Sequence, residues 1–431
     1  MAREMKDSGI EWIGEIPIEW VVLRNKDIFY EVNERCEDGS KYTLLSVSEY
    51  SGITPRSTVI KDGEYETHAE TLDGYKICRS GDIVMNIMLA WKRATAASSY
   101  DGIVSPAYCV YRGKGVDTKY YHYLFRTDNC ADMFKRYSTG IIDSRLRLYP
   151  EMFLSLRSIV PPYDEQKRIS HYLDTECSRI DTVINQTRAS IEEYKKLKQS
   201  VITEAVTKGI RKDRPMKDSG IGWLGDIPFE WQVKKTKYFS DGFCKGSGIT
   251  KEDVIKDGHV PCVRYGEIYT KFNQSFEKCV SYTELERISS PQFFSKGDIL
   301  FTCTGELIEE IGKCIAYVGD EECLAGGDII VMKHSQNPSF MSYVLNSDYA
   351  QAQKSCGKTK LKVVHVSAAE IKNVVIAVPS LEEQKEIADY LDKICAEISV
   401  LIEEKVILIS ELEKYKKSMI YEYVTGKKEV V

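Results

Sequence analysis

The chain of 431 residues lacks the sequence marks of membrane, disulfide-bonded and metal-binding proteins. No apolar run is long enough to cross a bilayer, and the first residues (MAREMKDSGIEW) lack the basic and apolar blocks of a secretory signal. The thirteen cysteines include no C-x-x-C pair, and the six histidines are scattered. We therefore expect a cytoplasmic protein with reduced thiols, no membrane contact and no metal site.

Complete catalytic motifs are also missing. The sequence has no G-x-S-x-G elbow and no H-E-x-x-H pair. Residues 352–359 (AQKSCGKT) fit a loose phosphate-binding loop, but a helix-like segment precedes them and a strand-like one follows, the reverse of a true loop. Val160-Pro161-Pro162-Tyr163 resembles the tail of an amino-methyltransferase signature, with valine where a polar residue would hold the amine. These absences favour a recognition or scaffold protein over an enzyme.

The chain also lacks an excess of positive charge. The net charge is −6, whereas a nucleic-acid-binding surface is usually basic. Local clusters of cations can still bind phosphates, because they set the field near a groove. Hydrophobic residues at 43% and charged residues at 29% are ordinary for a globular chain and exclude disordered and fibrous classes.

The dominant feature that is present is an internal repeat. Residues 5–20 (MKDSGIEWIGEIPIEW) return at 216–231 (MKDSGIGWLGDIPFEW), and residues 165–174 (EQKRISHYLD) return at 383–392 (EQKEIADYLD). The first offset is 211 residues and the second is 218, so the two copies have nearly equal length. A tandem duplication of one unit predicts two similar domains, which can present two similar surfaces to one partner.

Each copy has the same order of expected elements. A segment rich in Gly, Trp and Pro opens it, and short β-branched and apolar runs follow turn residues. We expect strands at 83–85, 106–111 and 158–160, with counterparts at 299–301, 327–332 and 374–378. Helical patterns at 119–126 and 340–346 lie between them. The pattern predicts an α+β (mixed α/β) fold for each body.

Each copy then ends in a long helix. Residues 164–206 and 382–424 contain neither Gly nor Pro and are rich in Lys, Glu, Leu and Ile. At about 1.5 Å per residue such a helix is roughly 60 Å long, so packing against a matching helix is favoured over a surface helix on a single body. We expect an antiparallel coiled coil whose seam is formed by Leu173, Ile180, Ile184, Ile191, Leu391, Ile398, Ile402 and Ile409.

These patterns divide the chain into five segments. We expect a first globular domain at 1–163, a first long spacer helix at 164–209 and a second globular domain at 210–381. A second spacer helix at 382–426 and a C-terminal tail at 427–431 complete the chain.

Cations gather at the same place in both copies, shortly before the last strand of each domain. Lysines can neutralise phosphates and arginines can contact guanine edges, although a solvated surface stretch would have the same composition. The predicted DNA-binding residues are Lys135, Arg136, Arg145 and Arg147 in the first copy and Lys354, Lys358, Lys360 and Lys362 in the second. The bodies differ greatly between similar flanks, as expected if each recognises something different.

Taken in order, these features resemble the specificity (S) subunits of type I restriction-modification systems. The resemblance covers essentially the whole chain and depends on motifs that occur twice. They are the opening segment with Trp12, Pro17 and Trp20, the Gly-Asp strand starts at 81–82 and 297–298, the breaks at Pro161 and Pro379, and the Glu-Gln-Lys helix starts at 165–167 and 383–385.

The resemblance implies a function that neither composition nor spacing could give. Each globular domain would be a target recognition domain for half of a bipartite, asymmetric sequence in double-stranded DNA, and the helices would set the gap. The helices would also dock two methyltransferase (modification) subunits, and the complex would recruit restriction/translocase subunits. S-adenosylmethionine, ATP and Mg would be held by those partners, and this chain would have neither cofactor nor catalysis. A self-sufficient DNA-modifying enzyme and a two-lobed adaptor for proteins alone remain the alternatives.

Overall fold

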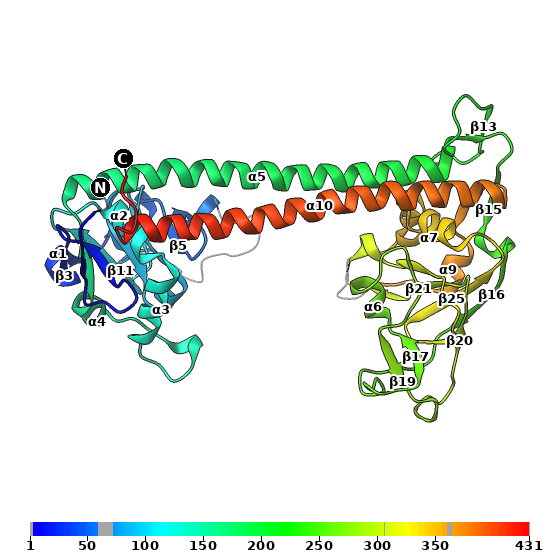
Figure 1. Cartoon of the computed structure of the whole chain (residues 1–431), viewed down its shortest axis with the longest axis horizontal. Helices are drawn as coiled ribbons and strands as arrows, with labels where there is room; N and C mark the ends of the chain where they lie inside the picture. Colours follow the sequence, from blue (N-terminus) through cyan, green and yellow to red (C-terminus); the bar gives the residue numbers. More distant parts are fainter. Residues whose placement is uncertain (1–2, 59–71, 306, 360–363, 431) are drawn as a thin grey trace. The chain divides into compact units, whose positions relative to one another are not determined.

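The computed structural model describes residues 3–58, 72–305, 307–359 and 364–430, which fold into two compact units (Figure 1). Unit 1 comprises Met1–Thr187 and Val406–Val431, and unit 2 comprises Arg188–Lys405. Each unit therefore contains one globular body and part of each long helix. The boundaries drawn from the sequence at 163, 209, 381 and 426 stay a prediction, because the units divide inside both helices.

A four-stranded antiparallel sheet forms the centre of unit 1. Its order is β4 (Phe29–Val32), β11 (Tyr108–Gly113), β8 (Ile83–Asn86) and β9 (Thr95–Ala97). Along β8, Ile83 and Met85 pack with helices α2 (Thr118–Phe125) and α3 (Asp128–Arg136). Val84 packs on the opposite side with the hairpin of β5 (Leu45–Ser48) and β6 (Gly52–Pro55). Alternation along the strand thus buries both faces of the sheet, which explains why its strands have few polar residues.

The body of unit 2 has an enlarged version of this plan. Strands β16 (Ser240–Lys245), β25 (Ile329–His334), β21 (Ile299–Thr302), β23 (Cys314–Tyr317) and β18 (Ser275–Phe276) form a five-stranded sheet. A second sheet has the order β19 (Ser281–Thr283), β17 (Val260–Val263), β24 (Cys323–Ala325), β20 (Phe293–Phe294). Helices α7 (Pro338–Asn346) and α8 (Asp348–Ser355) cover the first sheet through one shared apolar core. The expected α+β fold is confirmed, and the bodies differ most in these added strands.

The last strand of each body leads directly into a long helix. Strand β12 (Arg157–Val160) pairs with β3 (Val21–Arg24), and β27 (Val375–Val378) pairs with β15 (Gln232–Lys235). After the breaks at Pro161 and Pro379, helix α5 extends over Tyr163–Lys208 and helix α10 over Leu381–Val424. Both helices are continuous, because neither contains Gly or Pro to interrupt the backbone hydrogen bonds.

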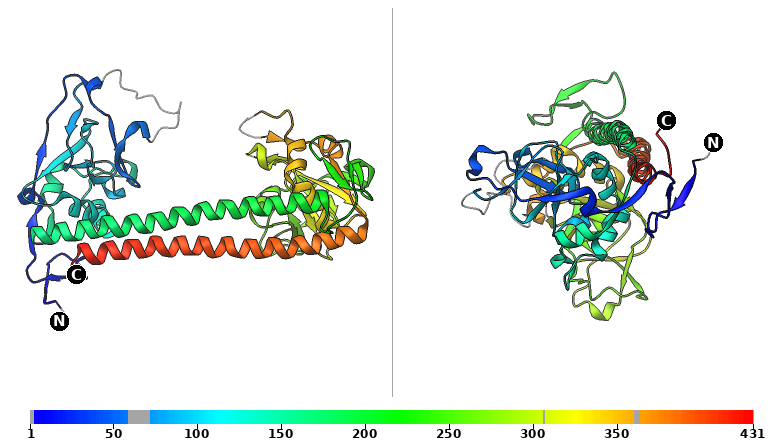
Figure 2. Two further views of the ribbon diagram at one scale, coloured as in Figure 1. Left: turned by 90° about the horizontal axis from the view of Figure 1, so that it is seen from above. Right: turned by 90° about the vertical axis from the view of Figure 1, so that its left-hand side faces the viewer.

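Within each unit, the segments of α5 and α10 lie side by side and run antiparallel (Figures 1 and 2). In unit 1, Tyr423 Oη lies 3.3 Å from Tyr172 Oη and Lys416 Nζ lies 2.7 Å from the Asp181 carboxylate. In unit 2, Lys198 Nζ donates to Ser399 Oγ at 2.9 Å. In unit 1, residues later in α5 contact residues earlier in α10, as antiparallel packing requires. Lys416 and Lys198 therefore each have a polar partner on the other helix.

The structure buries most of the expected seam. Leu173, Ile180, Ile184, Ile191, Leu391 and Ile398 are all buried. Ile402 and Ile409 are half-buried instead. Among the described residues, none of the helices combines the length and apolarity that a bilayer span requires.

Candidate nucleic-acid interface

Residues of the repeated segments form the contacts that hold each body to its long helix. We call these repeated Trp, Glu and Gln contacts the frame. In unit 1 the buried Trp20 indole donates to Glu165 Oε2 at 2.9 Å, and Arg3 binds the same carboxylate at 2.6 and 2.9 Å. Burial alone would raise the pKa of Glu165, but the hydrogen bonds from Arg3 and Trp20 outweigh it and lower the pKa. The carboxylate is therefore ionised, and it satisfies two buried donors at once.

Unit 2 repeats this frame with the second copy of each residue. The Trp231 indole donates to Glu383 Oε2 at 3.0 Å, and Arg214 forms an ion pair with Glu383. The neighbouring glutamines also have equal roles, since each one donates to a proline carbonyl and accepts from the amide that precedes a helix. Those bonds are Gln166 to Pro161 O (2.7 Å) and from Asp117 N (2.9 Å), and Gln384 to Pro379 O (3.0 Å) and from Asn337 N (3.0 Å).

The four predicted DNA-binding residues of unit 1 lie together on the end of α3 and the loop after it. Lys135 binds Asp143 at 2.9 Å and lies 4.9 Å from the Trp91 ring. Arg136 is largely exposed, with Glu11 3.7 Å away. Among the described residues, neither Arg145 nor Arg147 has a carboxylate within 4.0 Å. Arg147 Nη1 instead donates to Arg145 O at 3.1 Å. The structure thus places the cluster on α3 and one loop, while its contact with DNA stays a prediction.

The second predicted cluster is different, and Lys354 was wrongly chosen. Its side chain is buried at 1% exposure, and its Nζ donates to Gly312 O at 2.7 Å. Burial lowers the pKa of Lys354 to about 8. The residue lies on the inner face of α8, so it cannot reach a phosphate. Lys358 is nearly buried and pairs with Glu370 at 2.6 Å, while Lys360 and Lys362 lie outside the described residues.

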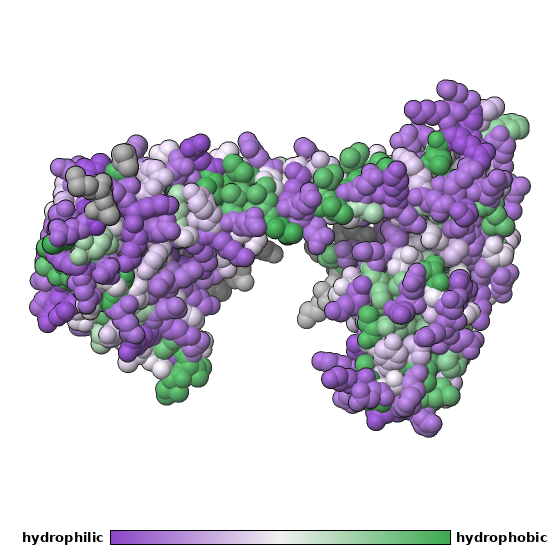
Figure 3. Space-filling model, viewed as in Figure 1, coloured by the Kyte–Doolittle hydropathy of each residue, from purple (hydrophilic) through white to green (hydrophobic). Residues whose placement is uncertain are grey.

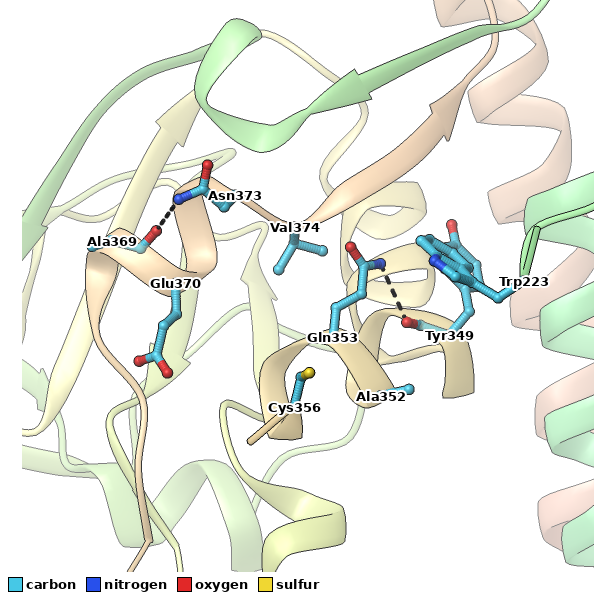
Figure 4. A pocket seen from close by; sticks show the side chains of 9 residues that line it. All are labelled: Trp223, Tyr349, Ala352, Gln353, Cys356, Ala369, Glu370, Asn373 and Val374. Carbon is cyan, nitrogen blue, oxygen red and sulfur yellow. Dashed lines mark hydrogen bonds between the residues drawn. The ribbon is translucent and has the colours of Figure 1, made fainter. Parts of the chain in front are cut away.

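The structure agrees with the rejection of residues 352–359 as a phosphate-binding loop. Figure 4 shows Ala352, Gln353 and Cys356 at the C-terminal end of helix α8, whereas a phosphate-binding loop precedes a helix N-terminus. They line a hollow of about 680 Å³ in which Trp223 stacks on Tyr349 with ring centroids 5.4 Å apart. Glu370, the carboxylate among the described residues that line this hollow, is held by Lys358. Within the described part of the chain, no group of three His, Cys, Asp or Glu side chains is placed to hold a metal ion.

Sequence reasoning missed a basic hollow in unit 2. It measures about 710 Å³, and its lining includes the exposed residues Lys245, Lys251, Lys271 and Tyr265. Its other charged residues are Arg264 and Glu267, which pair at 2.9 Å, and Asp328, so cations exceed carboxylates. The lining also includes Gly326, whose backbone lies close to that of Gly246. A Cβ on Gly246 would come within 2.1 Å of Gly326 O, so this close approach requires glycine. The sequence signal that could have indicated this hollow is the presence of two glycines at 246 and 248, next to Lys245, and two more at 326 and 327. We regard this hollow as the candidate phosphate contact of unit 2.

Comparison with known proteins agrees with this architecture. Residues 228–409 match the family model of the type I restriction modification DNA specificity domain. The type I restriction enzyme MjaVIII specificity subunit of Methanocaldococcus jannaschii is 25% identical over 427 residues, covering 96% of this chain and 93% of the relative. The putative MjaX specificity subunit of the same organism is 24% identical, with 96% and 95% covered.

Two solved structures share the fold. A chain from a study of complex assembly and conformational transition of the type I R-M system superposes with a TM-score of 0.69 at 16% identity, covering 96% of this chain and 99% of that one. The HsdS subunit from Thermoanaerobacter tengcongensis gives a TM-score of 0.54 at 18% identity, with 96% and 98% covered. The chain is similar to type I restriction-modification specificity subunits over nearly its whole length.

Proposed function

We propose that this chain is the DNA specificity subunit of a type I restriction-modification complex, and that each body recognises one half of a bipartite, asymmetric target. The observation that carries the proposal is the contrast between frame and body. The Trp, Glu and Gln residues of the frame recur with the same bonds in both units. The bodies differ in strands and in the placement of cations, on the α3 loop in unit 1 and in the basic hollow in unit 2. Two units that share the same frame but have different surfaces are what recognition of two half-sites of different sequence requires.

We further propose that the long helices dock the modification subunits, which in turn bring in restriction subunits. Support comes from α10 in unit 1, where the consecutive residues Val406, Ile407 and Leu408 are 53%, 52% and 42% exposed (Figure 3). Three consecutive helical residues span about 200° of the helix surface, so this apolar face extends well beyond the seam. A partner helix packing on it would bury these side chains.

In this proposal, catalysis and its cofactors belong to the partners. S-adenosylmethionine, ATP and Mg would be bound by the modification and restriction subunits, and this chain would supply base contacts and assembly surfaces. The net charge of −6 fits such a division, because partner subunits can provide much of the phosphate contact. The alternative of a protein-only adaptor makes no use of the arginines on the α3 loop.

An exchange of one body tests the proposal. Residues 21–160 are replaced by the corresponding body of another specificity subunit, and the methylated sequence is determined by methylome sequencing of a host that expresses the partners. We expect one half of the target to change while the other half and the gap stay the same, because unit 2 and both helices are unaltered. A matched exchange of residues 232–378 should change the opposite half. An unchanged target in both exchanges would contradict the proposal.

A further inference from the structure

The loop after α3 in unit 1 presents apolar side chains to solvent. Tyr137, Ile141 and Ile142 are 44%, 98% and 54% exposed. Figure 3 shows hydrophobic atoms grouped on the part of unit 1 that, in Figure 1, extends below α3. A single exposed apolar residue is ordinary, but an isoleucine pair at the end of a protruding loop is a contiguous surface that a soluble chain usually covers.

The loop is held in shape, so the two isoleucines cannot fold back onto the body. Thr139 and Arg147 exchange backbone hydrogen bonds of 2.9 Å across its base, and Asp143–Arg145 form a 3₁₀ turn. Gly140 has φ +157°, and a Cβ there would come within 2.6 Å of Arg145 O. Only glycine permits this close approach of the two sides of the loop. The hydrogen bonds across the base and the 3₁₀ turn therefore fix the conformation of the loop that carries Ile141 and Ile142.

Cations lie on the same loop and at the end of α3. Arg145 and Arg147 are on the returning side of the loop without a carboxylate partner among the described residues, and Arg147 Nη1 donates to Arg145 O at 3.1 Å. Arg136 lies at the end of α3, and the acidic residue of the turn, Asp143, is bound by Lys135. A loop with an apolar tip and cations closer to its base matches a nucleic-acid groove, where phosphates flank the apolar faces of stacked bases.

We propose that Ile141 and Ile142 form a wedge that enters a groove of the DNA and opens a base step in the half-site of unit 1. This inference rests on the proposed function and adds the residues that deform the target. In this proposal the arginines bind the phosphates on either side of the step. The isoleucine side chains leave water and bury their apolar surface against the bases. The cost of unstacking then depends on the base step, so the wedge contributes to sequence preference.

The second copy has no such wedge in its sequence. Gly357 has φ +73° and takes the place of Gly140, and it is followed by Lys358 and Thr359 rather than by two isoleucines. The proposal therefore concerns one half-site alone.

The test uses the full chain purified with its modification subunits and a duplex that contains the target found by methylome sequencing. 2-Aminopurine replaces successive bases of the unit 1 half-site, apart from the methylated base, because methyltransferases flip that base themselves. We expect its fluorescence to rise at one step with the wild type and not with the Ile141→Ser/Ile142→Ser variant. The variant should bind the target about tenfold more weakly, with an unchanged salt dependence because no charge is lost.

Three matched variants separate the roles. Ile141→Leu/Ile142→Leu should retain binding and the fluorescence rise, and Ile18→Ser, which alters another exposed isoleucine of unit 1, should have no effect. Arg145→Ala/Arg147→Ala should reduce the salt dependence of binding, with a slope smaller by about 1–2.

The outcomes distinguish this inference from the proposed function. If the wild type prefers its target over a scrambled duplex and the serine variant prefers it equally, the wedge is wrong and the specificity function stands. If the serine variant loses its modification subunits instead of its DNA affinity, the tip is a protein contact and the wedge is again wrong. If the wild type shows no preference between the duplexes, both the specificity function and the wedge are wrong.

Discussion

Replacing Trp20 or Trp231 by alanine is expected to lower the free energy of unfolding of its own unit by about 4 kcal/mol. Both indoles are fully buried at 0% exposure, and each donates to a buried glutamate. The substitution removes a large apolar surface and leaves a cavity in the core. It also leaves Glu165 or Glu383 short of one hydrogen-bond donor, which adds the cost of an unsatisfied buried charge. Calorimetric or urea-induced unfolding of the full chain measures the loss.

Trp223 provides a matched control for this prediction. It belongs to the same repeated segment as Trp231, but it is 50% exposed and stacks on Tyr349. Trp223→Ala should therefore cost only about 1 kcal/mol, the order of one aromatic contact. Equal losses for Trp223→Ala and Trp231→Ala would show that the Trp–Glu frame does not stabilise the unit as we describe.

Lys354→Met is expected to raise the stability of unit 2 at pH 7 relative to the wild type by up to about 3 kcal/mol. At that pH the lysine is protonated in both the folded and unfolded states, and the folded state carries the cost of burying a charge with a single carbonyl partner. Methionine has a similar length and no charge. Leaving Gly312 O without a donor offsets part of the gain.

The pH dependence of this difference has a definite sign. Burial lowers the pKa of Lys354 to about 8 in the folded state, against about 10.5 in the unfolded chain. Between these values the unfolded state binds the extra proton, so the wild type gains stability as the pH rises from about 8 to about 10.5. The advantage of Lys354→Met should shrink over the same window. Unfolding of both proteins across this range measures it, and an advantage independent of pH would contradict the buried charge.

Much of the fold could be predicted because its signals are local. The strands at 83–85 and 299–301 follow Gly81 and Gly297, which have φ of +89° and +96° and form the turn that begins each strand. The long helices follow from an unbroken run of helix-forming residues after Pro161 and Pro379. The extra strands of unit 2 were not predicted, because β18 and β20 have two residues each and depend on pairing with distant strands.

The candidate site was only partly predictable, because a cation in the sequence does not reveal which way it faces. Lys135 and Lys354 both lie near the end of a helix before the last strand, yet Lys135 is exposed and Lys354 faces the core. The basic hollow of unit 2 combines Lys245, Lys251 and Lys271 from separate segments, and close glycine contacts bring those segments together. Such a site is a product of tertiary packing and has no compact motif.

The central claim is that two unlike bodies on equal frames recognise two unlike half-sites. Methylome sequencing of the host with the chain present and with its gene deleted tests it most directly. We expect methylation at one bipartite, asymmetric sequence with a fixed gap, and the loss of that methylation on deletion. A methylation pattern that does not change on deletion, or a lost target whose two halves are the same sequence, would contradict the account.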